Sequence, residues 1–188
     1  MLARGTTRDH SAMAHSPSLP PEVVTRLLAH PAPEVRQAVA RRTDLTPAQL
    51  AALADDPDLG VRVLLALRQP APPPRVLLRS YLEYSGAGRA ALPHKPGFPT
   101  EGLAVYAADP HPPLRLLAAF DPDAGPELLA RLSRDGHPDV RVAAARSAGL
   151  PPERLVELTA DDGERVAATA AANPEFPVAA MRGHYALG

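Results

Sequence analysis

Apolar and polar positions recur along the chain in a fixed pattern with a period of 26 residues. The segment "LPPEVVTRLLAHPAPEVRQAVARR" starts at Leu19, and "LTPAQLAALADDPDLGVRVLLALR" starts 26 residues later at Leu45. Further copies begin at Ala71, Phe98, Ala124 and Leu150, and a truncated copy begins at Phe176. Self-similarity at a period of this length is typical of arrays of small supersecondary units.

Each copy predicts two short helices joined by a turn. Proline stands where the first helix begins, a position at which its missing N–H costs nothing, as at Pro21, Pro47, Pro73, Pro126 and Pro152. Three residues on comes an apolar column on one helix face: Val24, Leu50, Val76, Leu103, Leu129, Leu155 and Met181. The first helix closes at Asp56, Asp109, Asp135 and Asp161. The second helix carries an apolar position, then arginine, and ends in small residues that let neighbouring helices approach closely.

Helices of this length are too short to be stable alone, so stacking of the copies must supply the core. The pattern therefore predicts an all-α, right-handed α-solenoid of about six to seven two-helix repeats over residues 19–188. Residues 1–18 are polar and lack the repeat, and we expect them to form a flexible tail.

The unit "LxxDPDxxVR" followed by "LPPExLxxL" resembles the leucine-rich repeat variant family, a HEAT-like helical solenoid. The resemblance covers roughly residues 19–188. It implies that one helix of each pair is α-helical and the other is short or 3₁₀-like, and it implies an interaction role more than a chemistry. Some relatives carry a cysteine-rich, cluster-binding segment; this chain has no cysteine, so that activity is not carried over.

Composition narrows the possible chemistry. The absence of cysteine excludes disulfides, thiolate zinc sites and cysteine nucleophiles. The seven histidines show no helical i, i+4 pair, so neither a metal site nor a cofactor is expected. The net charge of −1 argues against a general nucleic-acid binder. No apolar run approaches the ~20 residues of a membrane span, and we expect a cytoplasmic protein.

The most regular polar feature is an arginine column in the second helix: Arg36, Arg62, Arg115 and Arg141. These guanidiniums could bind phosphates or an acidic partner. Alternatively, each arginine pairs with an aspartate of its own or the next repeat and locks the turns. The aspartate column has nearly the same membership, which favours the structural interpretation. The first repeat differs, because His30 stands at its aspartate position.

The third repeat, residues 71–97, is degenerate and enlarged. It gathers several side chains that are common in binding hot spots, in a chain with few aromatics. They are Tyr81, Tyr84, Arg89, His94 and Lys95, the only lysine. We predict that these residues bind a partner. The alternative is an imperfect stack in which tyrosine fills a gap, and a small ligand at this repeat is left open.

The sequence thus favours a non-catalytic protein–protein interaction or scaffold module. The alternative is a nucleic-acid-binding or DNA-glycosylase-like helical-repeat protein that reads phosphates with an arginine-lined face. A glycosylase needs a catalytic carboxylate in a basic cleft with stacking aromatics, and this chain has no tryptophan. The truncated copy "FPVAAMRGHYALG" predicts a weak cap, so a homo-oligomer formed through the end repeats is a further hypothesis.

Overall fold

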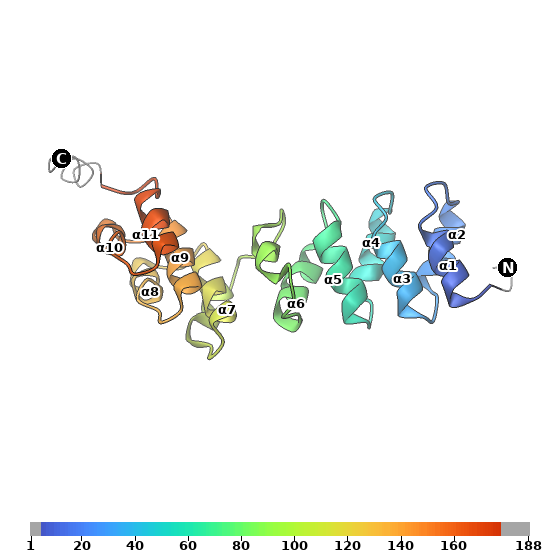
Figure 1. Cartoon of the computed structure of the whole chain (residues 1–188), viewed down its shortest axis with the longest axis horizontal. Coiled ribbons are helices and arrows are strands. Elements are labelled where there is room, and N and C mark those ends of the chain that lie inside the picture. The colour runs from blue at the N-terminus through green and yellow to red at the C-terminus, as the bar shows by residue number, and fades with distance from the viewer. Residues whose placement is uncertain (1–4, 178–188) are drawn as a thin grey trace. The chain divides into compact units, whose positions relative to one another are not determined.

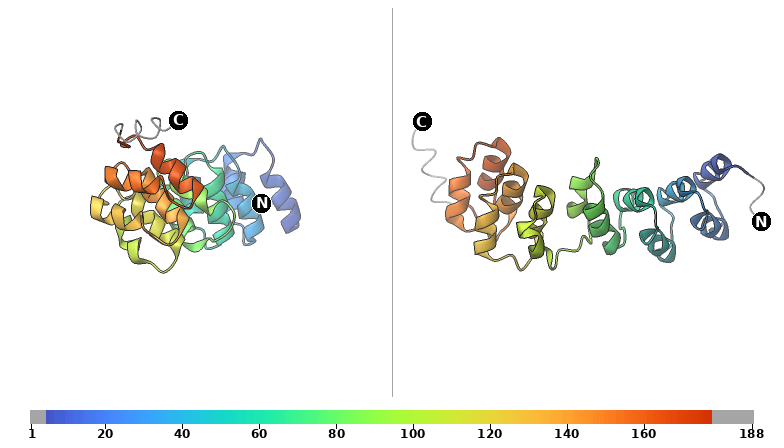
Figure 2. Two further views of the ribbon diagram at one scale, coloured as in Figure 1. Left: turned by 60° about the vertical axis from the view of Figure 1, so that its left-hand side comes forward. Right: turned by 90° about the horizontal axis from the view of Figure 1, so that it is seen from below.

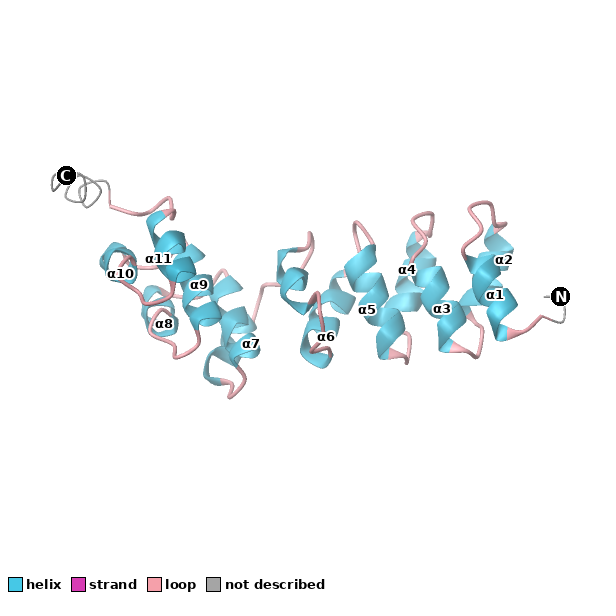
Figure 3. Cartoon of the chain, viewed as in Figure 1, coloured by secondary structure: helices cyan, strands magenta, loops and turns pink. Residues whose placement is uncertain are grey.

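The computed structural model describes residues 5–177, which divide into two compact units between Pro99 and Thr100. All regular secondary structure of the described residues is helical (Figure 3). Unit 1 contains α1 (Thr7–Ala14), α2 (Pro21–Leu28), α3 (Pro33–Ala40), α4 (Pro47–Ala54), α5 (Leu59–Arg68), α6 (Pro74–Glu83) and the 3₁₀ helix η1 (Arg89–His94). Unit 2 contains η2 (Leu103–Ala108), α7 (Pro112–Arg115), η3 (Leu116–Phe120), α8 (Pro126–Leu132), α9 (Pro138–Arg146), α10 (Pro152–Leu158) and α11 (Glu164–Ala171).

Each unit is a stack of two-helix repeats, as predicted. In unit 1 the second helices pack side by side, with α3 between α1 and α5, and η1 lies against α5 and α6 (Figure 1). Among the first helices, α2 packs against α4, so the unit has two helical layers (Figure 2). In unit 2, α9 packs against both η3 and α11. The all-α helical-repeat architecture of the described residues is therefore confirmed.

Proline placement and apolar columns explain the helices. Proline is the first residue of α2, α4, α8 and α10, and it also opens the second helices α3, α7 and α9. Val35, Val61, Val140 and Val166, from one column of the second helices, are fully buried. The small residues Ala40, Ala66 and Ala145 at the helix ends are also fully buried, as close packing of neighbouring helices requires.

The structure differs from the expected flexible tail, because residues 7–14 form α1. Thr6 caps this helix: its hydroxyl accepts the N–H of Asp9, and the Asp9 carboxylate accepts the N–H of Thr6. The helix packs against α3, and Ala14 is fully buried. α1 thus occupies the place of a second helix in a preceding repeat. The repeat pattern did not reveal it because α1 lacks both the opening proline and the apolar columns.

The resemblance implied a short or 3₁₀-like helix in every pair, but within residues 5–177 the 3₁₀ helices are confined to η1, η2 and η3. Local sequence gives the reason for the first two. Pro93 lies inside η1, where it removes a backbone donor, and Gly102 precedes η2 with a positive φ of 74°. The other described pairs are α-helical in both members.

In the described part of the chain, no helix combines the length and apolar character needed to cross a membrane.

Candidate functional site

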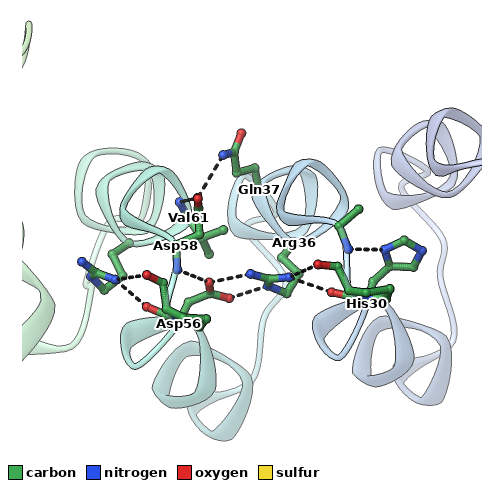
Figure 4. A network of polar contacts seen from close by, with 10 residues as sticks. His30, Arg36, Gln37, Asp56, Asp58 and Val61 are labelled. Carbon is green, nitrogen blue, oxygen red and sulfur yellow. Dashed lines mark hydrogen bonds and ion pairs between the residues drawn. The ribbon is translucent and has the colours of Figure 1, made fainter.

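Within each unit, the arginine column forms a ladder that runs from one repeat to the next. In its first rung, Arg36 Nη1 donates to the carbonyls of His30 and Pro31 in its own turn, at 2.7 and 3.0 Å. The Nε and Nη2 atoms donate to the two carboxylate oxygens of Asp56 at 2.7 and 2.9 Å. Figure 4 shows this rung. One guanidinium therefore ties the turn of one repeat to the aspartate of the next.

The same rung recurs along the chain, and we call the set the arginine ladder. Arg115 and Arg141 make bidentate contacts with Asp135 and Asp161, with N–O distances of 2.7 and 2.8 Å, and both also donate to two carbonyls of their own turns. In the remaining rung, Arg62 bonds Glu83 through Nη2 alone. Bidentate partners are 20 residues apart, whereas Glu83 follows Arg62 by 21. One extra residue before α6, which starts at Pro74, has moved the acid, and Arg62 Nε is left buried without a partner in the described residues.

The aspartates of the ladder also close the turns. Asp56 Oδ1 accepts the N–H of Asp58, and Asp161 accepts the N–H of Gly163 in the same way. The neighbouring Asp58 caps α5 by accepting the N–H of Val61 and is held by Gln37 of α3 (Figure 4). Hydrogen bonding from arginine holds the pKa of Asp161 below the ordinary value of 3.8, and it raises the pKa of Arg141. The guanidiniums of the column therefore face the protein's own carboxylates.

A pair of histidines occupies the rung at the N-terminal end of unit 1. His10 lies one repeat before Arg36, and His30 one repeat before Asp56. His10 Nδ1 and His30 Nε2 are 3.1 Å apart, and the rings meet edge to face. His30 Nδ1 accepts the N–H of Ala32, as the aspartates do for their own turns. That bond leaves the proton of neutral His30 on Nε2, which then donates to His10.

A second row of side chains reaches backward to the preceding repeat, and we call these residues the cap donors. Arg42 Nη1 donates to the carbonyls of Ala14 and Ser16 at the end of α1. Gln69 does the same for Ala40 and Arg42, and Asn173 for Ala145 and Ser147. These carbonyls end a helix and have no partner inside it, so the cap donors satisfy them.

Lys95 is one of the cap donors, although its sequence suggested a partner contact. Its ammonium donates to the carbonyls of Leu67 and Gln69 at 2.8 and 2.9 Å. Two of its three N–H groups are thus bonded at the end of α5. Lys95 stands one repeat after Gln69 and so occupies the next cap-donor position.

The structure brings Tyr81 and Arg89 together inside the third repeat. Tyr81 is 1% exposed and meets the ring of Phe98 edge to face. The Arg89 guanidinium lies 4.5 Å from the centre of the Tyr81 ring, and its Nε donates to the Tyr81 carbonyl. The Tyr81 ring is therefore buried among its neighbours and fills a gap in the stack, and it is not exposed for the partner contact predicted for it. Tyr84 is half-buried, and its hydroxyl donates to the carbonyl of Ala87.

Exposed arginine and histidine side chains gather where the second helices of unit 1 end. His15 and Arg41 cap α1 and α3, and Arg68 and His94 are the last residues of α5 and η1. All four are exposed, and they define what we call the basic edge. The bonds of the cap donors join these helix ends in order, so the four residues lie in a row. Arg41 and Arg68 make no ion pair within the described residues.

The basic edge holds little negative charge. Its carboxylate, Asp44, accepts from Nε and Nη2 of Arg42 at 2.9 and 2.6 Å and is neutralised there. A cavity of about 280 Å³ lies beside Arg41, with Ala14, Pro17 and Ala38 among its walls. Asp56 and Asp58 lie instead at the start of α5, where Arg36 and Gln37 bind them.

No cluster of three or more His, Cys, Asp or Glu side chains within residues 5–177 could hold a metal ion. Histidines of the turns instead serve locally: His111 contacts Asp109 at 3.2 Å, and His137 Nδ1 accepts the N–H of Asp139 at the start of α9. The expected weak cap begins at Phe176, which is buried, but residues 178–188, with Met181 and His184, lie outside the described residues.

No family model matches the sequence, and no curated protein matches it significantly. Among solved structures, the chain is similar to "a leucine-rich repeat variant with a novel repetitive protein structural motif". The two are 28% identical, with a TM-score of 0.59. The match covers 91% of this chain and 68% of the other.

Proposed function

Since the chain is a helical-repeat protein that resembles the leucine-rich repeat variant, as its repeat unit predicted, we propose that it is a non-catalytic protein-interaction module. It binds its partner through the basic edge of unit 1. The observation that carries this proposal is the row of exposed arginine and histidine side chains in register, of which the two arginines have no ion pair in the described residues. Arginine side chains of this kind are enriched in the energetically dominant positions of interfaces.

The internal ladders support the same proposal. The regular arginines, which would serve a phosphate-reading face, are engaged with Asp56, Glu83, Asp135 and Asp161. A nucleic acid bound along that column would have to displace these pairs. The basic edge is open, and a rigid stack beneath it presents its side chains without the cost of ordering a loop on binding.

The proposal moves the binding site within the chain. Of the five residues predicted in the third repeat, Tyr81, Arg89 and Lys95 are committed to packing and capping. His94 is exposed and belongs to the basic edge. The site thus keeps one end of the predicted segment and extends from there along α5, α3 and α1.

The test is affinity capture from nuclease-treated lysate of the source organism with three proteins. They are the wild type, the edge variant Arg41→Ser/Arg68→Ser, and the matched variant Arg26→Ser/Arg131→Ser, whose two arginines are exposed elsewhere. All four arginines lie on the surface, so we expect unchanged circular dichroism. One protein retained by the wild type and the matched variant but lost by the edge variant supports the proposal.

Two other outcomes contradict it in different ways. A specific protein retained equally by all three places the interaction on another surface. Recovery of nucleic acid alone, in lysate without nuclease, contradicts the interaction module and favours the nucleic-acid alternative.

A further inference from the structure

We propose that the basic edge binds an extended acidic peptide whose carboxylates recur at every third residue. This inference rests on the proposed function and specifies the partner's chemistry. It starts from the spacing of the cations: Arg41 and Arg68 end successive second helices, α3 and α5, which pack side by side. Axes of packed helices lie about 8–10 Å apart. The edge therefore offers two guanidiniums about 10 Å apart.

An extended chain matches this spacing. In the polyproline II conformation, which has three residues per turn and rises about 3.1 Å per residue, side chains three residues apart lie on one face about 9 Å apart. Carboxylates at positions i and i+3 can then meet Arg41 and Arg68, and a third at i+6 or i−3 reaches the position of His94 or His15. Guanidinium and carboxylate form planar, paired hydrogen bonds, which give such contacts their geometry.

The cavity beside Arg41 adds a second requirement. Loop residues 15–17 and 41–44 line it together with Ala14 and Ala38, so it mixes apolar and polar walls. Its volume of about 280 Å³ suits one side chain and is too small for a whole helix, whose diameter with side chains is about 10–12 Å. We therefore expect an aliphatic residue next to the carboxylate that meets Arg41.

Nucleic acid fits the same edge less well. Binding to nucleic acid grows with the number of phosphates that Lys and Arg neutralise, through counterion release, and this edge offers two unpaired arginines for that purpose. Bases also need aromatic side chains to stack on, and no aromatic side chain apart from the imidazoles of His15 and His94 is part of the edge.

The experiment measures fluorescence anisotropy with labelled synthetic peptides at low and physiological salt. The first probe has three Asp residues at every third position with Leu beside one of them. The second has the same composition with the Asp residues adjacent, and the third has Asn in place of Asp. We expect the first to bind several-fold more tightly than the second, and the third not to bind. Arg41→Ser and Arg68→Ser should each weaken the first peptide about two- to fivefold, whereas Arg26→Ser should not.

Equal affinity for the two Asp peptides would overturn the spacing argument. Tighter binding of a single-stranded oligonucleotide with the same charge would overturn the choice of a peptide. Both results are separate from the capture experiment: a lysate partner lost by the edge variant would uphold the interaction module even if the spaced peptide failed.

Discussion

Two adjacent aspartates allow a direct test of how much the buried ion pairs between repeats contribute to stability. Asp56 and Asp55 both bind an arginine 20 residues away through both carboxylate oxygens, at 2.7 to 2.9 Å. They differ in burial. The side chains of Arg36 and Asp56 are 11% and 6% exposed, whereas those of Arg75 and Asp55 are 53% and 65% exposed. The two pairs thus compare equal geometry in different surroundings.

We expect Asp56→Asn to destabilise unit 1 by about 3 kcal/mol. Removing one partner of a buried ion pair costs about 3–5 kcal/mol, because the other charge stays buried and uncompensated. The lower end applies here, because Arg36 keeps its bonds to the carbonyls of His30 and Pro31, and asparagine can still accept the N–H of Asp58. Asp55→Asn should leave stability unchanged within error, because water screens and replaces an exposed pair.

Urea titration followed by far-ultraviolet circular dichroism measures both variants. With a slope of about 1.5 kcal/mol per molar urea, a loss of 3 kcal/mol lowers the midpoint for unit 1 by about 2 M. Hydrogen exchange of the α3 and α4 amides assigns the change to these repeats. Equal shifts of the urea midpoint for the two variants, or an Asp56 variant as stable as the wild type, would refute the argument. In either case burial would not determine how much an ion pair of the ladder contributes to stability.

Three further predictions concern the other contacts. Lys95→Leu should lower the stability of unit 1, because it leaves two helix-end carbonyls unpaired. Lys95→Gln should retain most of the stability, because glutamine bonds the equivalent carbonyls at the previous repeat. Thermal melts distinguish the two variants, and equal losses would contradict the capping role. The α1 amides should exchange more slowly in the double variant His10→Arg/His30→Asp than in the wild type. Each single variant should protect them less than the double variant does, and additive effects of the two substitutions would contradict a shared rung. The pKa values of Asp135 and Asp161 are held below 3.8 by hydrogen bonds from arginine. Their contribution to stability is therefore present above the unfolded value and is lost as pH falls through the lower folded values. The free energy of unfolding of unit 2 should fall below about pH 4, and a variant with Asn at both positions should start lower at pH 7 and show a shallower acid loss; identical acid profiles would contradict this.

The fold could be predicted from the sequence because the signals for helices in this chain are local and periodic. Proline at helix starts and one apolar column per helix suffice to place two helices in each copy. The pairing of Arg36 with the aspartate of the next repeat was one of two registers that the pattern allowed, and only the stacking geometry chooses between them. The helix over residues 7–14 was missed because its stability comes from packing on α3 and not from its own pattern.

The candidate site was harder to predict, for a related reason. Tyr81 and Lys95 are unusual residues in this chain, and their rarity alone suggests a functional site. Burial and helix-end carbonyls explain both. One signal was present in the sequence: Arg42, Gln69 and Lys95 follow one another at nearly the repeat period, and all three can donate hydrogen bonds. Cap donors vary in residue type, because the carbonyls require only a hydrogen-bond donor on a side chain that is long enough to reach them. For this reason the column is not visible as a repeated residue in the sequence.

The two ladders also determine how such a chain can change its length. Every arginine rung reaches forward by about 20 residues, and every cap donor reaches back by 26 to 29. Inserting or deleting one complete period within a unit leaves each donor facing an equivalent acceptor in its new neighbour. A change of any other size breaks bonds on both sides of the junction and strands buried guanidiniums and carbonyls. The hydrogen-bond pattern therefore favours growth and shortening of the array by whole repeats. It tolerates the single extra residue before α6 only because Arg62 gives up one of its two bonds to the acid and contacts Glu83 through Nη2 alone.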